Sequence, residues 1–219
     1  MQFQRLVAFA VAAFASLASH AQEVRYSFSG VVSGPGLTNP SFDLHIAAGT
    51  AFTGEFWYDA SVASYAGAVT QDGGTTYGYR TGGLTVTIGG LTAASTMPAQ
   101  IYVNDNAYLG YDGFSISAND PFNPISVTGT SYSADAFFLG FNDATGNAFS
   151  SSALPTTLGS LFNDNLMGLD FVNGLGDQYT LNGNITEVHN VAAVPEPSTY
   201  ALMLAGFGAL GFVARRRAK

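Results

Sequence analysis

The sequence predicts an all-β protein: an antiparallel β-sandwich, of jelly-roll or Ig-like type, flanked by an N-terminal signal peptide and a C-terminal transmembrane helix. Apolar and polar residues alternate with a period of two in several segments, and Gly, Asn, Asp and Pro separate these segments. β-Branched and aromatic residues, which suit a pleated sheet, are abundant. Within 219 residues we place a signal peptide at 1–21, one body domain at 22–188, a linker at 189–194 and a C-terminal segment at 195–219.

The N-terminus has the three parts of a secretory signal. Arg5 supplies a basic start, Leu6–Leu17 is an apolar run, and Ser19-His20-Ala21 places small residues at −3 and −1 of a cleavage site after Ala21. The alternative is a buried N-terminal helix, which the lack of an amphipathic pattern disfavours. We therefore expect the general secretion machinery to export the body.

Four segments of the body give the clearest strand patterns. These are Val24, Tyr26 and Phe28 on one face of a first strand; Phe52, Phe56 and Tyr58 on a second; the run 84–88 between two Gly pairs; and Tyr179, Leu181 and Ile185 within Gln178–Val188. Only residues 156–162 show a helical spacing. His45, between Leu44 and Ile46, is expected to be a half-buried strand residue.

Charge and composition exclude several functions. Between Gln22 and Val194, two basic residues (Arg25 and Arg80) oppose fourteen acidic ones, which gives a formal charge of −12 there against −8 for the whole chain. A field of this sign repels phosphate backbones, so we expect no nucleic-acid partner. The absence of cysteine excludes thiol catalysis and Cys-ligated zinc or iron–sulfur centres.

The C-terminal pattern predicts a membrane-spanning helix. Residues 200–214 carry no charge and would span about 22 Å as a helix. Arg215, Arg216, Arg217 and Lys219 follow at once, and basic residues beside an apolar helix stay cytoplasmic, which predicts an N-out, C-in anchor in the inner membrane. The alternative is an amphipathic core helix that ends in a solvated basic face. Before it, Pro195-Glu196-Pro197 favours an extended, accessible backbone.

These elements together resemble a known sorting signal. Val194–Lys219 resembles the PEP-CTERM sorting domain of exported proteins in Gram-negative bacteria that produce exopolysaccharide. The resemblance implies that an exosortase, a transpeptidase-like membrane enzyme, acts near Pro195-Glu196-Pro197 and that this chain is its substrate. Tyr26–Gly30 and Phe52–Phe56 also resemble the first strands of many proteins with this tail, which assigns no functional residue.

Repeated Asn-Asp dipeptides leave two interpretations open. They occur at 104–105, 119–120, 142–143 and 163–164, with spacing too irregular for a repeat protein. Asn and Asp favour turns, and we expect turns there. The alternative is a calcium site, whose first candidates are Asn104, Asp105, Asn106 and Asp112, followed by Asp143 and Asp164.

No catalytic constellation stands out, so we expect no enzyme and no cofactor. Beyond the predicted signal the histidines are His45 and His189, and neither a Gly-x-Ser-x-Gly nor an HExxH motif is present.

The sequence therefore predicts a non-enzymatic structural or adhesive protein of the cell surface or extracellular matrix. The second candidate is a carbohydrate-binding module, with a calcium-dependent version, that would contact exopolysaccharide. The aromatic candidates are Trp57, Tyr58, Tyr77, Tyr79, Tyr108 and Tyr111, with Tyr77 and Tyr79 on one face. The third is a polysaccharide hydrolase with paired carboxylates.

Overall fold

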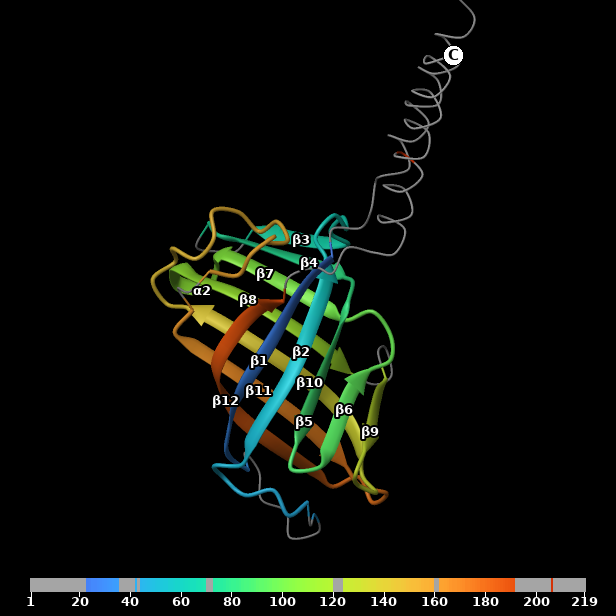
Figure 1. Ribbon diagram of the computed structural model, residues 1–219. Helices are drawn as coiled ribbons and strands as arrows, with labels where there is room; N and C mark the ends of the chain where they lie inside the picture. Colours follow the sequence, from blue (N-terminus) through green and yellow to red (C-terminus); the bar gives the residue numbers. More distant parts are fainter. Residues whose placement is uncertain are drawn as a thin grey trace, which may run out of the picture.

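A computed structural model describes residues 23–35, 42, 44–69, 73–119, 124–159, 162–191 and 206 (Figure 1). The predicted signal peptide lies outside this set, as do Pro195, Glu196, Pro197 and the basic tail. Of the predicted helix 200–214 only Gly206 is described, as helical and exposed. No helix in the described part of the chain has the length and apolar composition needed to cross a bilayer.

The described body is one antiparallel sheet of twelve strands with one four-residue helix. The strands are β1 (Glu23–Pro35), β2 (Ala51–Asp59), β3 (Ala66–Val69), β4 (Thr75–Arg80), β5 (Gly83–Ile88), β6 (Leu91–Ser95), β7 (Gln100–Asn106), β8 (Tyr111–Asn119), β9 (Ile125–Thr128), β10 (Ser133–Asp143), β11 (Asp164–Val172) and β12 (Gln178–Val191), and the helix is α2 (Ala107–Gly110). Their order in the sheet is β3-β4-β7-β8-β10-β11-β12-β1-β2-β5-β6-β9.

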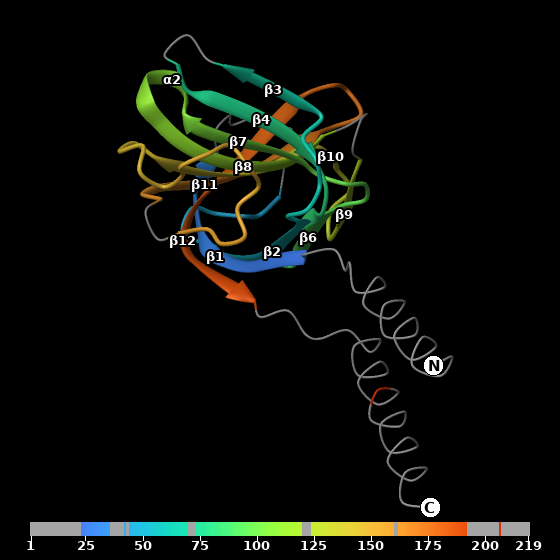
Figure 2. The same cartoon turned by 90° about the horizontal axis from the view of Figure 1, so that it is seen from above.

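The sheet is coiled into a half-barrel (Figures 1 and 2). The edge strand β9 packs against β10, which lies in the middle of the strand order, so the two halves of the sheet face each other across a common core. The predicted antiparallel all-β class is confirmed. Two separate sheets, as in a sandwich, are not present among the described residues: hydrogen bonds join all twelve strands. Irregularities in the register of β1 and β10 accompany this curvature, since bulges bend a strand.

Aromatic side chains fill the core between the two halves. Phe56 is fully buried at the centre, and its ring lies 5.1 Å from that of Tyr26, 5.6 Å from Phe141 and 6.0 Å from Phe114. Because these partners come from β1, β8 and β10, one ring of β2 joins both halves of the sheet.

Several glycines lie directly opposite an aromatic residue on the neighbouring strand. The pairs are Gly30–Phe52, Gly54–Phe28, Gly67–Tyr77, Gly78–Tyr102, Gly83–Trp57 and Gly168–Phe138. In each pair the ring occupies the space of a missing side chain; a Cβ on Gly54, for example, would lie 2.3 Å from Phe28 Cζ. The many glycines of this sequence therefore serve packing as well as turns.

The four strands with clear alternation form as predicted, with their apolar faces buried. Three details differ. β12 continues to Val191, so His189, placed in the linker by the prediction, belongs to the sheet. Residues 156–159, within the stretch 156–162 that has a helical spacing, form no helix: 156 and 157 lie in a bend, and 158 and 159 are irregular. His45 is exposed and outside any strand, with a left-handed φ of 49°.

Candidate functional site

The segment 144–159 between β10 and β11, here called the covering loop, is tied to the core by tyrosine hydroxyls. Tyr58 and Tyr79 donate to the carbonyls of Pro155 and Ser152, each at 2.8 Å. Tyr26 accepts the N–H of Leu158 at 2.5 Å. Burial raises the pKa of Tyr58 well above its ordinary value and also raises the pKa of Tyr79. Tyr58 and Tyr79, two of the six aromatic candidates for sugar stacking, are therefore structural.

Two aspartates that the sequence offered as calcium candidates also hold this loop. Asp112 and Asp143 lie opposite each other on β8 and β10, and both are buried. Asp112 accepts the N–H of Asn106 at 2.8 Å and that of Phe149 at 2.6 Å. Asp143 accepts hydrogen bonds from the Thr145 hydroxyl at 2.7 Å and from the N–H groups of Thr145 and Asn147, each at 2.9 Å. The two carboxylates therefore accept hydrogen bonds from backbone N–H groups and a hydroxyl of the chain itself.

The other calcium candidates lie nearby but do not form an ion cage. Asn104 accepts a hydrogen bond from the Thr76 hydroxyl at 2.8 Å, and Asn106 donates to Asp105 at 3.0 Å. Asp164 is exposed at the start of β11. Within the described residues no three His, Cys, Asp or Glu side chains gather closely enough to hold a metal ion. The turn interpretation fits Asp143, which organises residues 144–147.

Asp143 makes the stability of the body depend on pH. Hydrogen bonds from the Thr145 hydroxyl, and then from backbone N–H groups, lower the pKa of this carboxyl below its ordinary 3.8. The ionised Asp143 carboxylate therefore stabilises the folded state at pH values above the unfolded-state pKa. This stabilisation is lost as the pH falls through the lower folded-state pKa. We expect the melting temperature of Asp143→Asn to lie below that of the wild type at pH 7, with the gap narrowing on acidification below about pH 4. Calorimetric scans of both proteins across pH test this, and a gap that widened in acid would contradict it.

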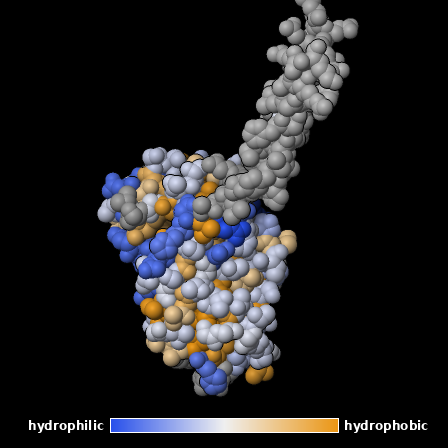
Figure 3. Space-filling model, viewed as in Figure 1, coloured by the Kyte–Doolittle hydropathy of each residue, from blue (hydrophilic) through white to orange (hydrophobic). Residues whose placement is uncertain are grey.

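A polar groove of about 480 Å³ lies on the outer face of β12, β1, β2 and β5. Its side chains form a row across neighbouring strands, which runs Glu187, Ser29, Thr53, Thr87 and continues to Thr92 and Thr128. Ser27, Glu55, Thr85 and His189 also line it. Viewed as in Figure 1, this face is mostly pale in Figure 3, with strongly hydrophilic residues gathered in its upper part and apolar residues scattered over it.

The groove contains a serine, a histidine and a carboxylate, but not in a catalytic order. Glu187 Oε2 accepts the hydroxyl of Ser29 at 3.3 Å and lies 3.6 Å from His189 Nε2. Nucleophilic activation instead requires the histidine to stand between the hydroxyl and the acid. The side chains of His189 and Glu187 are 70% and 64% exposed, so water surrounds both.

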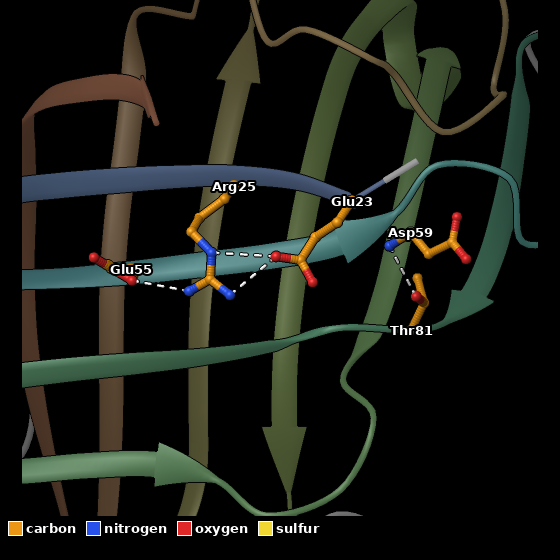
Figure 4. Close-up of polar contacts among 5 residues, drawn as sticks. All are labelled: Glu23, Arg25, Glu55, Asp59 and Thr81. Carbon is orange, nitrogen blue, oxygen red and sulfur yellow. Dashed lines mark hydrogen bonds and ion pairs between the residues drawn. The ribbon is translucent and has the colours of Figure 1, made fainter. Parts of the chain in front are cut away.

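At one end of this face an arginine lies between two glutamates (Figure 4). Arg25 makes ion pairs of 3.0 Å with Glu23 and with Glu55, and its guanidinium stacks 4.7 Å from the centre of the Trp57 ring. Figure 4 also shows the Thr81 hydroxyl accepting the N–H of Asp59 at 3.0 Å, which joins the end of β2 to the segment after β4. The charge of Arg25 is thus compensated, and Trp57 is half-buried beneath it.

The exposed aromatic residues differ from the expected pair. Tyr79 is buried against the covering loop, whereas Tyr77 is partly exposed, so these two do not form a shared platform. The side chain of Tyr108 lies outside the described set, and Tyr111 is exposed. Tyr65 and Tyr102 instead lie together on the outer face with their hydroxyls 3.1 Å apart. Alternation within one strand could not reveal this pair because its members come from different segments.

Comparison with known families decides the role of the C-terminus. Residues 193–217 match the model of the PEP-CTERM protein-sorting motif. This chain carries a PEP-CTERM sorting motif. The motif implies an exported protein, membrane-linked sorting to the cell surface and an exosortase-type processing partner. Neither a curated protein nor a solved structure matches the chain.

Proposed function

We propose that this protein is a non-enzymatic structural or adhesive component of the cell surface or extracellular matrix. It is exported by its signal peptide and held transiently in the inner membrane by residues 200–214, with the basic tail inside. An exosortase then processes it at Pro195-Glu196-Pro197. The observation that carries this proposal is the PEP-CTERM motif at 193–217, which follows a body with an N-terminal export pattern.

The boundary between body and motif supports delivery by cleavage. β12 ends at Val191, which pairs with Arg25 of β1, and the motif begins at residue 193. Cleavage near Pro197 would leave every strand of the sheet intact. The processed body would therefore keep its fold and its outer face after leaving the membrane.

A chain that ends at Val194 tests the role of the tail. We expect it to reach the soluble periplasmic or medium fraction, whereas the full chain is retained in membrane and surface fractions, because the apolar segment and basic residues are removed. Its melting temperature should equal that of the processed protein, since the sheet is complete. A matched full-length variant with Arg215, Arg216 and Arg217 changed to Ser keeps the apolar segment and tests orientation separately. Equal retention of the chain that ends at Val194 and the full chain would contradict the proposal.

The arrangement of the outer face favours glycan binding as a second candidate function. Tyr65 and Tyr102 expose their rings beside Arg80, on a surface otherwise made of short polar residues. Tyrosine offers an apolar face and a polar tip, which suits sugar rings. The third candidate, a hydrolase with paired carboxylates, is less favoured because Asp112 and Asp143, which lie opposite each other, accept hydrogen bonds from the chain itself.

A further inference from the structure

The two arginines of the body each lie over an aromatic ring, but only one of them is neutralised by acidic side chains. Each lies over an aromatic ring, Arg25 over Trp57 at 4.7 Å and Arg80 over Tyr65 at 5.0 Å. Two glutamates neutralise Arg25. No carboxylate in the described part of the chain forms an ion pair with Arg80, which is exposed. The guanidinium of Arg80 is therefore free to donate hydrogen bonds to a single carboxylate, although the body as a whole, with a formal charge of −12, repels polyanions.

Arg80 belongs to an exposed aromatic patch, here called the tyrosine platform: Tyr65, Gly78, Arg80 and Tyr102. The N–H of Tyr65 donates to the carbonyl of Gly78 at 2.9 Å, which fixes Tyr65 beside β4. Tyr102 lies opposite Gly78 on β7. A Cβ on Gly78 would lie 3.1 Å from atoms of both rings, so the rings meet over the glycine. Tyr65 is 47% exposed and Tyr102 is 37% exposed.

Hydrogen-bonding groups surround this platform, and the rows beside it in the described strands β4, β7 and β8 contain no acidic residue. The register of β4, β7 and β8 places three rows on the outer face: Thr76, Asn104 and Gly113; Gly78, Tyr102 and Ser115; Arg80, Gln100 and Ser117. The opposite face of β7 and β8 is the core, where Ile101, Val103 and Ile116 are fully buried. The patch therefore offers amides, hydroxyls, two aromatic rings and one positive charge.

We propose that the tyrosine platform binds a sparsely acidic polysaccharide, a largely neutral chain of sugars in which isolated units carry a carboxylate. The faces of the sugar rings stack on Tyr65 and Tyr102, and one carboxylate receives hydrogen bonds from the Arg80 guanidinium. Gln100 and Asn104, one on either side of Tyr102 along β7, hydrogen-bond the sugar hydroxyls. Positive charge and flat rings together favour this ligand over a neutral glycan, which would not need Arg80, and over an acidic peptide, which would not need a stacking surface.

This site is independent of the sorting motif, so its failure would leave the proposed delivery untouched. The test uses the mature protein recovered from cells and affinity electrophoresis in gels that contain lightly carboxymethylated dextran, in which few sugars carry a carboxylate, or unmodified dextran. We expect the carboxymethylated dextran to retard the wild type and the unmodified dextran to leave it unaffected. Arg80→Gln and Tyr102→Ala should each weaken the retardation about tenfold. The matched control Arg25→Gln, which alters the compensated arginine, should change it by less than about twofold.

Melting curves of each variant show whether it is folded. A second measurement needs no variant: salt raised to about 0.5 M should release the wild type from carboxymethylated dextran, because it screens an exposed ion pair. The proposal is overturned if carboxymethylated dextran does not retard the wild type, or if unmodified dextran retards it equally. It is also overturned if Arg80→Gln binds normally, or if Arg25→Gln loses as much affinity as Arg80→Gln.

Discussion

Replacing Phe56 by alanine is expected to lower the free energy of unfolding by about 4 kcal/mol. The ring of Phe56 is fully buried and contacts aromatic rings from both halves of the coiled sheet. Its removal leaves a cavity that the surrounding rings cannot close, because they belong to strands fixed by hydrogen bonds on both sides. Urea titration followed by tryptophan fluorescence measures the loss.

Two companion variants make this result interpretable. Phe56→Leu retains much of the volume, so we expect it to lose less than half as much stability and to remain folded if the alanine variant does not. Val69→Ala, at an exposed position of the edge strand β3, should change stability by less than about 0.5 kcal/mol. A small loss in Phe56→Ala, equal to that of Val69→Ala, would mean that the two halves of the sheet do not share a core.

Asp112→Ala is expected to cost about 3 kcal/mol, the second largest effect. The change removes the acceptor for the N–H groups of Asn106 and Phe149 and leaves both donors without it. The part of the covering loop around Phe149 should loosen first. Hydrogen exchange at these two amides measures the local effect, and thermal unfolding measures the global one.

The same variant separates a structural role from a calcium site. Asp112→Asn keeps one carbonyl acceptor and should lose about half as much stability as Asp112→Ala. Asp164→Ala, at an exposed acid of the same candidate set, should be close to neutral. We expect the wild-type melting temperature to be the same in calcium and in EDTA. A calcium-dependent increase that Asp112→Ala abolishes would contradict the structural role.

Local patterns predicted the strands whose alternation is strict. β1, β2, β5 and β12 each place apolar residues at every second position, since one face is core and the other is solvent. The joining of all strands into one sheet could not be predicted in this way. Ser29 and Glu187 are neighbours across β1 and β12 although 158 residues separate them, and no local signal specifies such a pairing.

The candidate sites show the same limit. Of the four Asn-Asp dipeptides, 142–143 lies beside a turn that Asp143 organises, because a short polar side chain can bond its own backbone. The turn predicted at 104–105 is wrong, since both residues lie within β7. That Asp112 reaches the N–H of Phe149 depends on the path of a loop that begins 32 residues later. The tyrosine platform likewise depends on the register that sets Tyr102 opposite Gly78. Only the C-terminal motif could be recognised from sequence alone, since its signal is contiguous.

The intact mass of the protein recovered from cells with and without the exosortase tests the central claim most directly. The account predicts a product that ends near Pro197 when the enzyme is present and a chain that extends to Lys219 when the enzyme is absent. An unprocessed C-terminus in both strains would contradict it and would make residues 200–214 a permanent anchor.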